Sequence, residues 1–280
     1  MKSKRFLSIF LTLCLAAGLA FSAGVSVHAA ETPAGYVAIC VDANVLGAGL
    51  LYGPALVPFN EGESAIDITD RFLGANAEIV SETWGDFLDG VKLPRNFTLN
   101  VPQVITAAVT DFSAAGGPVT AGAILRSADF AAFSGWMITI NNEMTMVGAS
   151  DEFPEDGDVL RWEFSLNFGN DLGYEDWFGT PGLITRTDKG GLVASIAQSQ
   201  GDCRRAVAAA RDSAMAVLGK LQATQTEIDA AAVALDAAMV PALEQWQAKL
   251  PEWLAGIISL PNWVQWIIMI AGFGWIWWFF

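Results

Sequence analysis

Histidine is almost missing from this 280-residue chain, which contains a single one, His28. We expect His28 to lie in an N-terminal segment that is removed, so the mature protein would have no imidazole. Ser-His-Asp and Cys-His catalysis, HExxH zinc chemistry and histidine-ligated haem all need one. The sequence therefore argues against most classes of enzyme, and we expect no catalytic residues.

Basic residues are also scarce, with 15 Lys and Arg against 30 Asp and Glu. Three of the basic residues, Lys2, Lys4 and Arg5, lie at the N-terminus, so the rest of the chain is still more acidic. A nucleic acid backbone is bound by clustered Lys and Arg, which this composition does not supply. The sequence therefore excludes nucleic acid as a partner.

The N-terminus has the pattern of an export signal. Its basic residues precede an uncharged stretch over residues 6–27, and a Val-x-Ala cleavage pattern ends at Ala29. We therefore predict a signal peptide over residues 1–30, which places the mature protein outside the cytoplasm. An uncleaved signal anchor is the alternative, because the uncharged run is long enough to span a bilayer.

The other end of the chain is apolar, and residues 253–280 contain no charged side chain. Their length suits a helix that crosses the hydrocarbon core of a bilayer, and seven of the eleven tryptophans lie in residues 246–280, as expected at membrane interfaces. We predict a membrane-associated tail over residues 251–280, in which residues 253–280 contact lipid. The tail could also lie along the interface or be a glycolipid-anchor signal.

Residues 36–42 have the periodicity of a strand. The two alternating sets are Val37, Ile39 and Val41, and Tyr36, Ala38 and Cys40. A second short strand is predicted over residues 56–59, and Pro58 confines it to a sheet edge. Ser64 is a favourable N-cap for a helix over residues 64–73.

Two further strands follow the pattern of a meander. Residues 136–140 alternate and lead into two asparagines, which tolerate the positive φ of a hairpin turn. Residues 159–166 alternate apolar side chains with polar ones such as Arg161 and Glu163, which is typical of a half-buried antiparallel strand. The predicted fold class is α+β, a small antiparallel β-rich domain with one helix, followed by an α-helical hairpin and a C-terminal apolar membrane segment.

Residues 134–143, 147–151 and 156–162 contain a motif of glycines, one tryptophan and turn-forming polar residues. The motif residues are Gly135, Trp136, Asn141, Gly148, Asp151, Gly157 and Asp158. This motif resembles the transcobalamin-like C-terminal domain of many bacterial surface proteins. The resemblance covers about residues 35–175 and implies a small α+β domain, which we place over residues 31–178.

The resemblance also suggests a ligand. In the vertebrate cobalamin carriers such a domain closes over one side of the corrinoid, opposite a helical-barrel domain, and this chain has no room for that second domain. Family membership does not carry the ligand with it. Cobalamin is therefore an alternative ligand, and no cofactor is expected.

Residues 201–250 are rich in alanine and are predicted to form a helical hairpin that acts as a stalk. Val207 and Ala214 lie on one helical stripe, and a capping box over residues 224–227 starts the second helix. This pattern resembles the short helical hairpin repeats that act as stalks in bacterial cell-surface proteins. Residues 179–200, which begin with Gly, Thr and Pro, are predicted to be a linker.

Carboxylates are the one catalytic option that the missing histidines leave, since glycosidases need only two of them. Five acids cluster in the predicted meander, at Asp151, Glu152, Glu155, Asp156 and Asp158. The chemistry of hairpin turns accounts for them, and they lack the spacing of a calcium loop. We therefore predict no metal site, and a carboxylate-based glycan hydrolase is the second alternative.

Four aromatic residues are candidates for ligand binding. Trp84, Tyr174 and Trp177 lie in predicted loops, where exposed aromatic side chains favour recognition. Trp136 shares a stripe with two isoleucines, which favours packing instead.

Cys40 and Cys203 are the thiols of the mature protein. Outside the cytoplasm they could form a disulfide that links the hairpin to the β-rich domain. The alternative for Cys40 is a small buried residue without a bond.

These features together predict an exported, membrane-anchored and non-enzymatic binding protein on the extracellular face of the cell envelope. Its partner would be a protein, a glycan or a small molecule. Corrinoid capture at the cell surface is the first alternative.

Overall fold

The structure, a computed structural model, describes residues 32–83, 85–108, 120–145, 147–175 and 179–240. These residues form one five-stranded sheet, in the order β2-β1-β8-β6-β7, and one three-stranded sheet, in the order β3-β4-β5. The strands of the first sheet are β1 (Gly35–Asp42), β2 (Leu50–Phe59), β6 (Gly135–Ile140), β7 (Glu143–Met144) and β8 (Val159–Ser165). Those of the second are β3 (Ala77–Glu82), β4 (Gly85–Lys92) and β5 (Ile124–Arg126).

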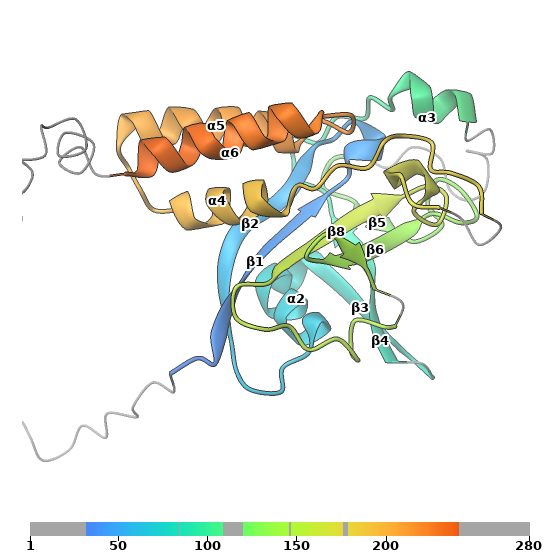
Figure 1. The fold of residues 1–280 in the computed structure, drawn as a ribbon. Helices are drawn as coiled ribbons and strands as arrows, with labels where there is room; N and C mark the ends of the chain where they lie inside the picture. Colours follow the sequence, from blue (N-terminus) through green and yellow to red (C-terminus); the bar gives the residue numbers. More distant parts are fainter. Residues whose placement is uncertain (1–31, 84, 109–119, 146, 176–178, 241–280) are drawn as a thin grey trace, which may run out of the picture.

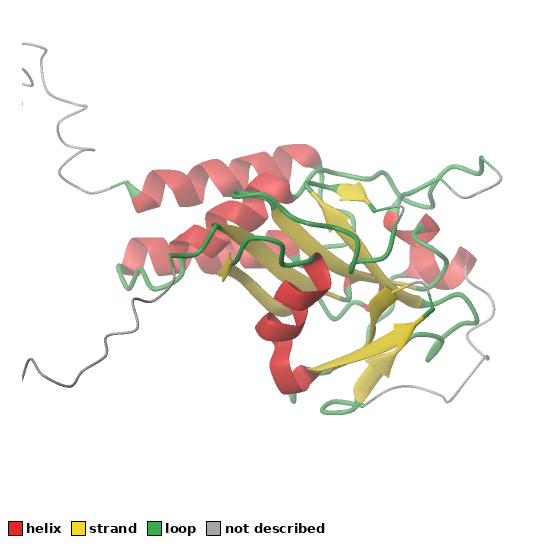
Figure 2. Cartoon of the chain, turned by 90° about the horizontal axis from the view of Figure 1, so that it is seen from below, coloured by secondary structure: helices red, strands yellow, loops and turns green. Residues whose placement is uncertain are grey.

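The described helices are α2 (Ala65–Leu73), α3 (Gln103–Ala108), α4 (Gly190–Ser199), α5 (Arg205–Leu218) and α6 (Gln225–Met239). Three short 3₁₀ turns, η1 (Asn44–Leu46), η2 (Gly74–Asn76) and η3 (Asn170–Leu172), complete the fold. Figure 1 shows α4, α5 and α6 on one side of the five-stranded sheet, and α2 with strands β3 and β4 on the other. Seen from below in Figure 2, α2 crosses in front of the strands.

Strand β1 lies in the middle of the molecule and is buried on both faces. Val37, Ile39 and Val41 face the core that α2 and the second sheet complete, and Ala38 and Cys40 face α4, α5 and α6. The predicted alternation over residues 36–42 is therefore confirmed. However, β1 pairs antiparallel with β2 and parallel with β8. The predicted antiparallel domain with one helix is wrong, because the described fold has a mixed sheet, a second sheet and several helices.

Both predicted helix starts are confirmed, and each is a complete capping box. The Ser64 hydroxyl oxygen accepts from the backbone N–H of Asp67, while the Asp67 carboxylate accepts from the backbone N–H of Ser64. Thr224 and Glu227 do the same at the start of α6. These reciprocal bonds satisfy donors that the first turn of a helix leaves free, which fixes where each helix begins.

The predicted linker over residues 179–200 is wrong in its second half, which forms helix α4. Its side chains Leu192, Val193 and Ile196 are buried against the sheet and against α5 and α6. Helices α5 and α6 do form the predicted hairpin. They do not stand apart as a stalk, because Val207, Leu218 and residues of α6 belong to the same apolar core as α4 and strand β1.

None of the helices in the described ranges is long and apolar enough to cross a membrane. The C-terminal apolar membrane segment of the predicted fold class therefore has no counterpart in the structure as described. The predicted tail over residues 251–280 and the predicted signal peptide over residues 1–30 lie outside the described residues.

The two outer strands of the five-stranded sheet are β2 and β7. Strand β2 contains Pro54 and Pro58, and the predicted position of Pro58 on an edge strand is confirmed. The side chain of Gln200, just after α4, donates from Nε2 to the carbonyl oxygen of Pro54 at 3.1 Å. This bond ties the helical layer to the sheet edge.

The face of β1 and β8 that looks toward the helices ends in a buried cluster of charges. Asp42 is completely buried, and Arg161 and Glu163 are each less than a tenth exposed. Arg161 Nε donates to Asp42 Oδ2 at 2.8 Å, and Arg161 Nη2 lies 2.8 Å from Glu163 Oε1. Because Asp42 and Glu163 are register partners on β1 and β8, Arg161 bridges the parallel pair.

The cluster continues to Lys189, which precedes α4. Its Nζ donates to the carbonyl oxygens of Leu218 at 3.2 Å and Lys220 at 2.7 Å. Burial lowers the pKa of Lys189 to about 8, with Arg161 acting in the same direction. Burial also raises the pKa of Glu163. Burial alone would lower the pKa of Arg161, but the carboxylates of Asp42 and Glu163 raise it above its ordinary value.

We predict that Arg161→Met strongly destabilises the fold, because it leaves two buried carboxylates without their cation. A broken buried pair typically costs about 3–5 kcal/mol of unfolding free energy, measurable by urea denaturation. Arg126→Met removes an exposed ion pair with Glu78 and should change stability much less. The triple variant Asp42→Asn, Arg161→Met, Glu163→Gln should recover part of the loss. Equal effects of Arg161→Met and Arg126→Met would contradict a central role for the cluster.

Lys189 gives a pH-dependent prediction. Because its pKa is lowered in the folded state, the unfolded chain binds more protons between about pH 8 and about pH 10, so this group's contribution to stability rises with pH there. The unfolding free energy of the native chain relative to Lys189→Met should therefore increase by about 1 kcal/mol from about pH 8 to about pH 9. Urea denaturation at both pH values measures this difference, and a constant or falling difference would refute it.

Candidate functional site

A groove of about 470 Å³ lies beside the β6–β7 hairpin, and it is the candidate functional site. It is formed by the end of β6, by strand β7, and by the loop that leads into β8. Its lining residues are Ile140, Asn141, Glu143, Met144, Thr145, Glu152, Phe153, Pro154, Glu155 and Asp158. The volume is in the range of pockets that hold small molecules or the side chains of a partner.

Two motif residues hold the walls of the groove together. Asn141 Nδ2 donates to Asp158 Oδ1 at 2.7 Å, and Asn141 Oδ1 accepts from the backbone N–H of Val159 at 3.0 Å. Asp158 Oδ2 also accepts from the backbone N–H of Glu155 at 2.8 Å. Asn141 has φ of 50°, which asparagine tolerates better than most residues. The predicted hairpin asparagine therefore fixes the turn and joins it to the start of β8.

The other motif residues shape the backbone near the groove. Gly157 has φ of 92°, and its N–H donates to the carbonyl oxygen of Tyr36 at 2.9 Å. The backbone N–H of Asp151 donates to the carbonyl oxygen of Gly148 at 2.9 Å. Gly135 is the first residue of β6. The motif therefore positions turns and strand ends.

The groove is lined by acidic residues together with several apolar side chains. Every charged residue that lines it is an acid: Glu143, Glu152, Glu155 and Asp158. Ile140, Met144 and Phe153 supply the apolar part, and Phe153 is 60% exposed. Because its ring is exposed and not buried, Phe153 offers an accessible apolar surface next to carboxylates. Such a surface suits a ligand that carries both positive charge and apolar groups.

Three of the groove's four acids belong to the cluster that the sequence revealed, where turn chemistry accounted for them. That explanation is correct for Asp158, which is bonded within the turn. Sequence reasoning missed Glu143, Met144 and Phe153 as site residues. The signal for Phe153 was its position between acids, in the sequence Glu152-Phe153-Pro154-Glu155, where an apolar ring would not be expected in a solvated turn.

Of the four predicted aromatic residues, the structure describes Trp136 and Tyr174, and neither of them lines the groove. Trp136 is 8% exposed, its indole N–H donates to the carbonyl oxygen of Leu125 at 3.0 Å, and its ring packs edge-on against Phe164. This is the packing alternative that its sequence pattern favoured. Trp84 and Trp177 lie outside the described residues.

Tyr174 is half-buried beside the charge cluster. The guanidinium of Arg186 lies 4.2 Å from the centre of its ring, which is a cation–π contact. Burial raises the pKa of Tyr174 to about 12, with Glu163 acting in the same direction, so its phenol stays neutral. Tyr174 Oη and Arg186 Nη2 are buried and have no hydrogen-bond partner in the structure as described. The ring is thus held by its neighbours and does not reach the groove.

The two cysteines among the described residues, Cys40 and Cys203, are both free. Cys40 is completely buried on the helix-facing side of β1, where burial raises the pKa of its thiol, and Cys203 is exposed. The possible disulfide between them is therefore not formed, and Cys40 is the small buried residue of the alternative. No group of three His, Cys, Asp or Glu in the described ranges is arranged to hold a metal ion.

Comparison with known families supports part of the sequence resemblance. A family model described as a domain of unknown function (DUF4430) matches residues 124–165, and this is the transcobalamin-like domain family. The match covers a short stretch, which contains strands β5 to β8. It does not extend to the helical hairpin, whose resemblance to a stalk repeat is not supported. No curated protein and no solved structure matches the chain. Residues 124–165 are therefore similar to this family, and they contain every residue that lines the groove.

Proposed function

We propose that the chain is an exported, non-enzymatic binding protein whose groove takes a basic, partly apolar segment of a partner protein. The observation that carries the proposal is the groove itself, in which carboxylates alone supply the charge around accessible apolar side chains. Its location inside the segment similar to the transcobalamin-like family supports a binding role for this part of the chain.

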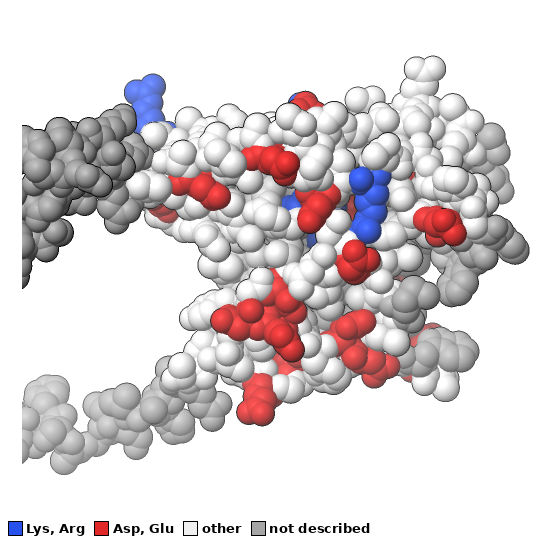
Figure 3. Space-filling model, in the orientation of Figure 1, with Lys and Arg blue, Asp and Glu red and all other residues white. Residues whose placement is uncertain are grey.

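Charge favours a cationic ligand. Asp and Glu outnumber Lys and Arg two to one in the sequence, and Figure 3 shows acidic side chains gathered around the region of helix α2, below α4, α5 and α6. Such a field attracts cations and repels anions as they approach, and it speeds association with a basic partner. Exposed carboxylates such as Glu143 and Glu155 would then pair with Lys or Arg at the groove.

Apolar contacts would supply the rest of the binding energy. Phe153 offers an exposed ring, and Met144 offers a flexible side chain that adapts to different partners. Strand β7 is the outermost strand of its sheet and contributes to the groove. An extended peptide can align with such a strand while its side chains enter the groove, which is a common mode of peptide recognition.

Export is supported by the basic, apolar and small-residue pattern of residues 1–30. Display on the extracellular face of the envelope remains a prediction that rests on the two chain ends. Corrinoid capture and carboxylate-based glycan hydrolysis also remain predictions, and no feature of the described residues favours either of them.

The proposal is tested with the full-length protein and a synthetic peptide that alternates Lys and Leu, labelled for fluorescence anisotropy. The double variant Glu143→Gln, Glu155→Gln should raise the Kd by roughly fivefold, since each exposed ion pair is worth about 0.5 kcal/mol. Added salt should weaken binding to the native protein, because exposed charges are screened.

The matched control is Asp212→Asn, which also removes a negative charge but lies on helix α5, away from the groove residues. It should leave the Kd unchanged. A peptide that alternates Glu and Leu should not bind. The proposal fails if the acidic peptide binds as well as the basic one, or if Asp212→Asn weakens binding as much as the groove variant.

A further inference from the structure

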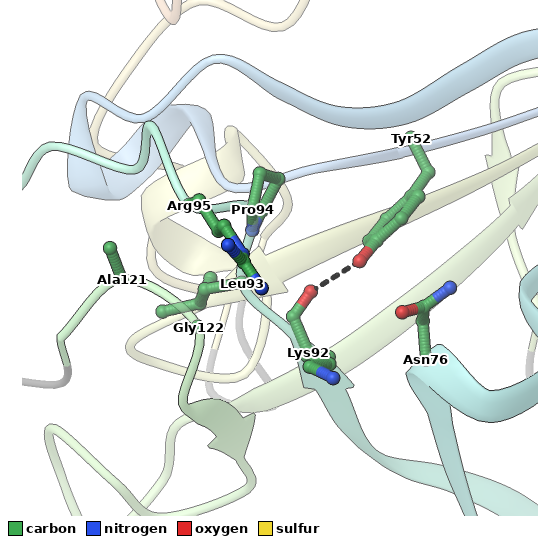
Figure 4. Close-up of a pocket in the computed structure, with 8 residues that line it drawn as sticks. All are labelled: Tyr52, Asn76, Lys92, Leu93, Pro94, Arg95, Ala121 and Gly122. Carbon is green, nitrogen blue, oxygen red and sulfur yellow. Dashed lines mark hydrogen bonds between the residues drawn. The ribbon is translucent and has the colours of Figure 1, made fainter.

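A second pocket, of about 650 Å³, lies where strand β2 meets the end of β4 (Figure 4). It shares no lining residue with the groove. Its polar side chains come from three parts of the chain: Tyr52 from β2, Asn76 from η2, and Lys92 and Arg95 from the end of β4 and the turn that follows. The charged residues that line it are both basic, which is unusual in so acidic a chain.

Among the residues that the structure describes, neither Lys92 nor Arg95 forms an ion pair with a carboxylate. The ion pairs of the described residues use other cations, namely Arg71, Arg126, Arg161, Arg204 and Lys220. Arg186, Lys189, Arg205 and Arg211 likewise form no ion pair within the described ranges, so what distinguishes Lys92 and Arg95 is that both line the same pocket. Because both residues line the same pocket, an anion that enters it is attracted by two positive charges.

The backbone around the two cations is fixed by hydrogen bonds. The N–H of Leu93 donates to the carbonyl oxygen of Ala123 at 2.7 Å, and the N–H of Gly122 donates to that of Leu93 at 3.1 Å. The N–H of Phe97 closes a turn onto the carbonyl oxygen of Pro94 at 3.0 Å. Lys92 and Arg95 therefore project from an ordered frame, which lowers the entropic cost of binding a ligand.

Tyr52 and Asn76 add two further recognition elements. The Tyr52 hydroxyl donates to the carbonyl oxygen of Lys92 at 2.6 Å, which holds the ring along one side of the opening (Figure 4). Burial raises the pKa of Tyr52, so the phenol stays neutral and puts no negative charge at the pocket. Asn76 Nδ2 donates to the carbonyl oxygen of Leu73 at 3.0 Å. Its amide oxygen is on the side that faces Lys92 and Tyr52 (Figure 4).

We propose that this pocket binds an acidic sugar, a monosaccharide unit that carries a carboxylate or phosphate group. Lys92 and Arg95 hold the anionic group, the amide oxygen of Asn76 accepts from a sugar hydroxyl, and the face of the Tyr52 ring packs against the C–H face of the sugar. Each contact matches one chemical feature of such a ligand. The site is independent of the proposed function of the groove.

Isothermal titration calorimetry of the full-length protein with glucuronic acid and with glucose 6-phosphate tests the proposal and separates the carboxylate from the phosphate source. At least one of them should bind at about 1 mM or below, whereas glucose should bind at least about tenfold more weakly. Arg95→Gln and Lys92→Gln should each weaken binding by about tenfold, since each removes one of two cations. Tyr52→Ala should weaken binding by removing the ring face.

The matched control is Arg205→Gln, which removes an exposed cation at the start of α5 and should leave the affinity unchanged. Circular dichroism confirms that each variant is folded. The proposal is overturned if neither acidic sugar binds with a Kd of about 1 mM or below, or if Arg205→Gln weakens binding as much as Arg95→Gln. It is also overturned if inorganic phosphate binds as tightly as the acidic sugars, because the sugar would then contribute nothing.

Discussion

The buried bridge from Arg161 to Asp42 and Glu163 is the interaction on which the rest of the arrangement depends. It joins strands β1 and β8, which are distant in sequence and parallel in the sheet. Parallel neighbours cannot be set in register by a short hairpin, so side-chain contacts must do it. A slip of one residue would turn Arg161 toward the apolar core on the other face, where it would have no carboxylate.

The position of the groove follows from that register. Strand β8 pairs on its other side with β6, and the backbone N–H of Ala38 on β1 bonds to the carbonyl oxygen of Asp158 at 2.9 Å. Asp158 in turn holds Asn141 at the end of β6. The carboxylates of the groove are thus placed by a chain of contacts that starts at β1. The site is built from turns, but the turns are attached to the most deeply buried strands of the protein.

The sequence predicted strands and helix caps well where the local signal was complete. The alternation over residues 36–42, the turn asparagine Asn141 and the capping boxes at Ser64 and Thr224 each depend on a few neighbouring residues. The environment of a strand's second face is set by distant segments. From their side chains alone, Arg161 and Glu163 therefore indicated a solvated face of β8. In the structure both are buried, and Lys189 at the start of α4 lies close enough to interact with them.

Helix α4 escaped prediction for a similar reason. It begins with Gly190 and Gly191, has no side chain that caps its start, and contains small residues that give a weak periodic signal. Burial against β1 stabilises it, and no local pattern reports such burial. The groove itself could not be predicted, because its walls meet only when β6, β7 and the loop before β8 fold together.

The edge strand β2 has a consequence for how molecules of this protein meet. Proline has no amide hydrogen, so Pro54 and Pro58 leave two positions of that strand unable to donate to an incoming chain. Gln200 already occupies the carbonyl oxygen of Pro54. At high concentration, other copies of the protein would therefore find few free backbone groups on strand β2 with which to pair. This protects a chain of such apolar composition from extending its sheets into fibrils.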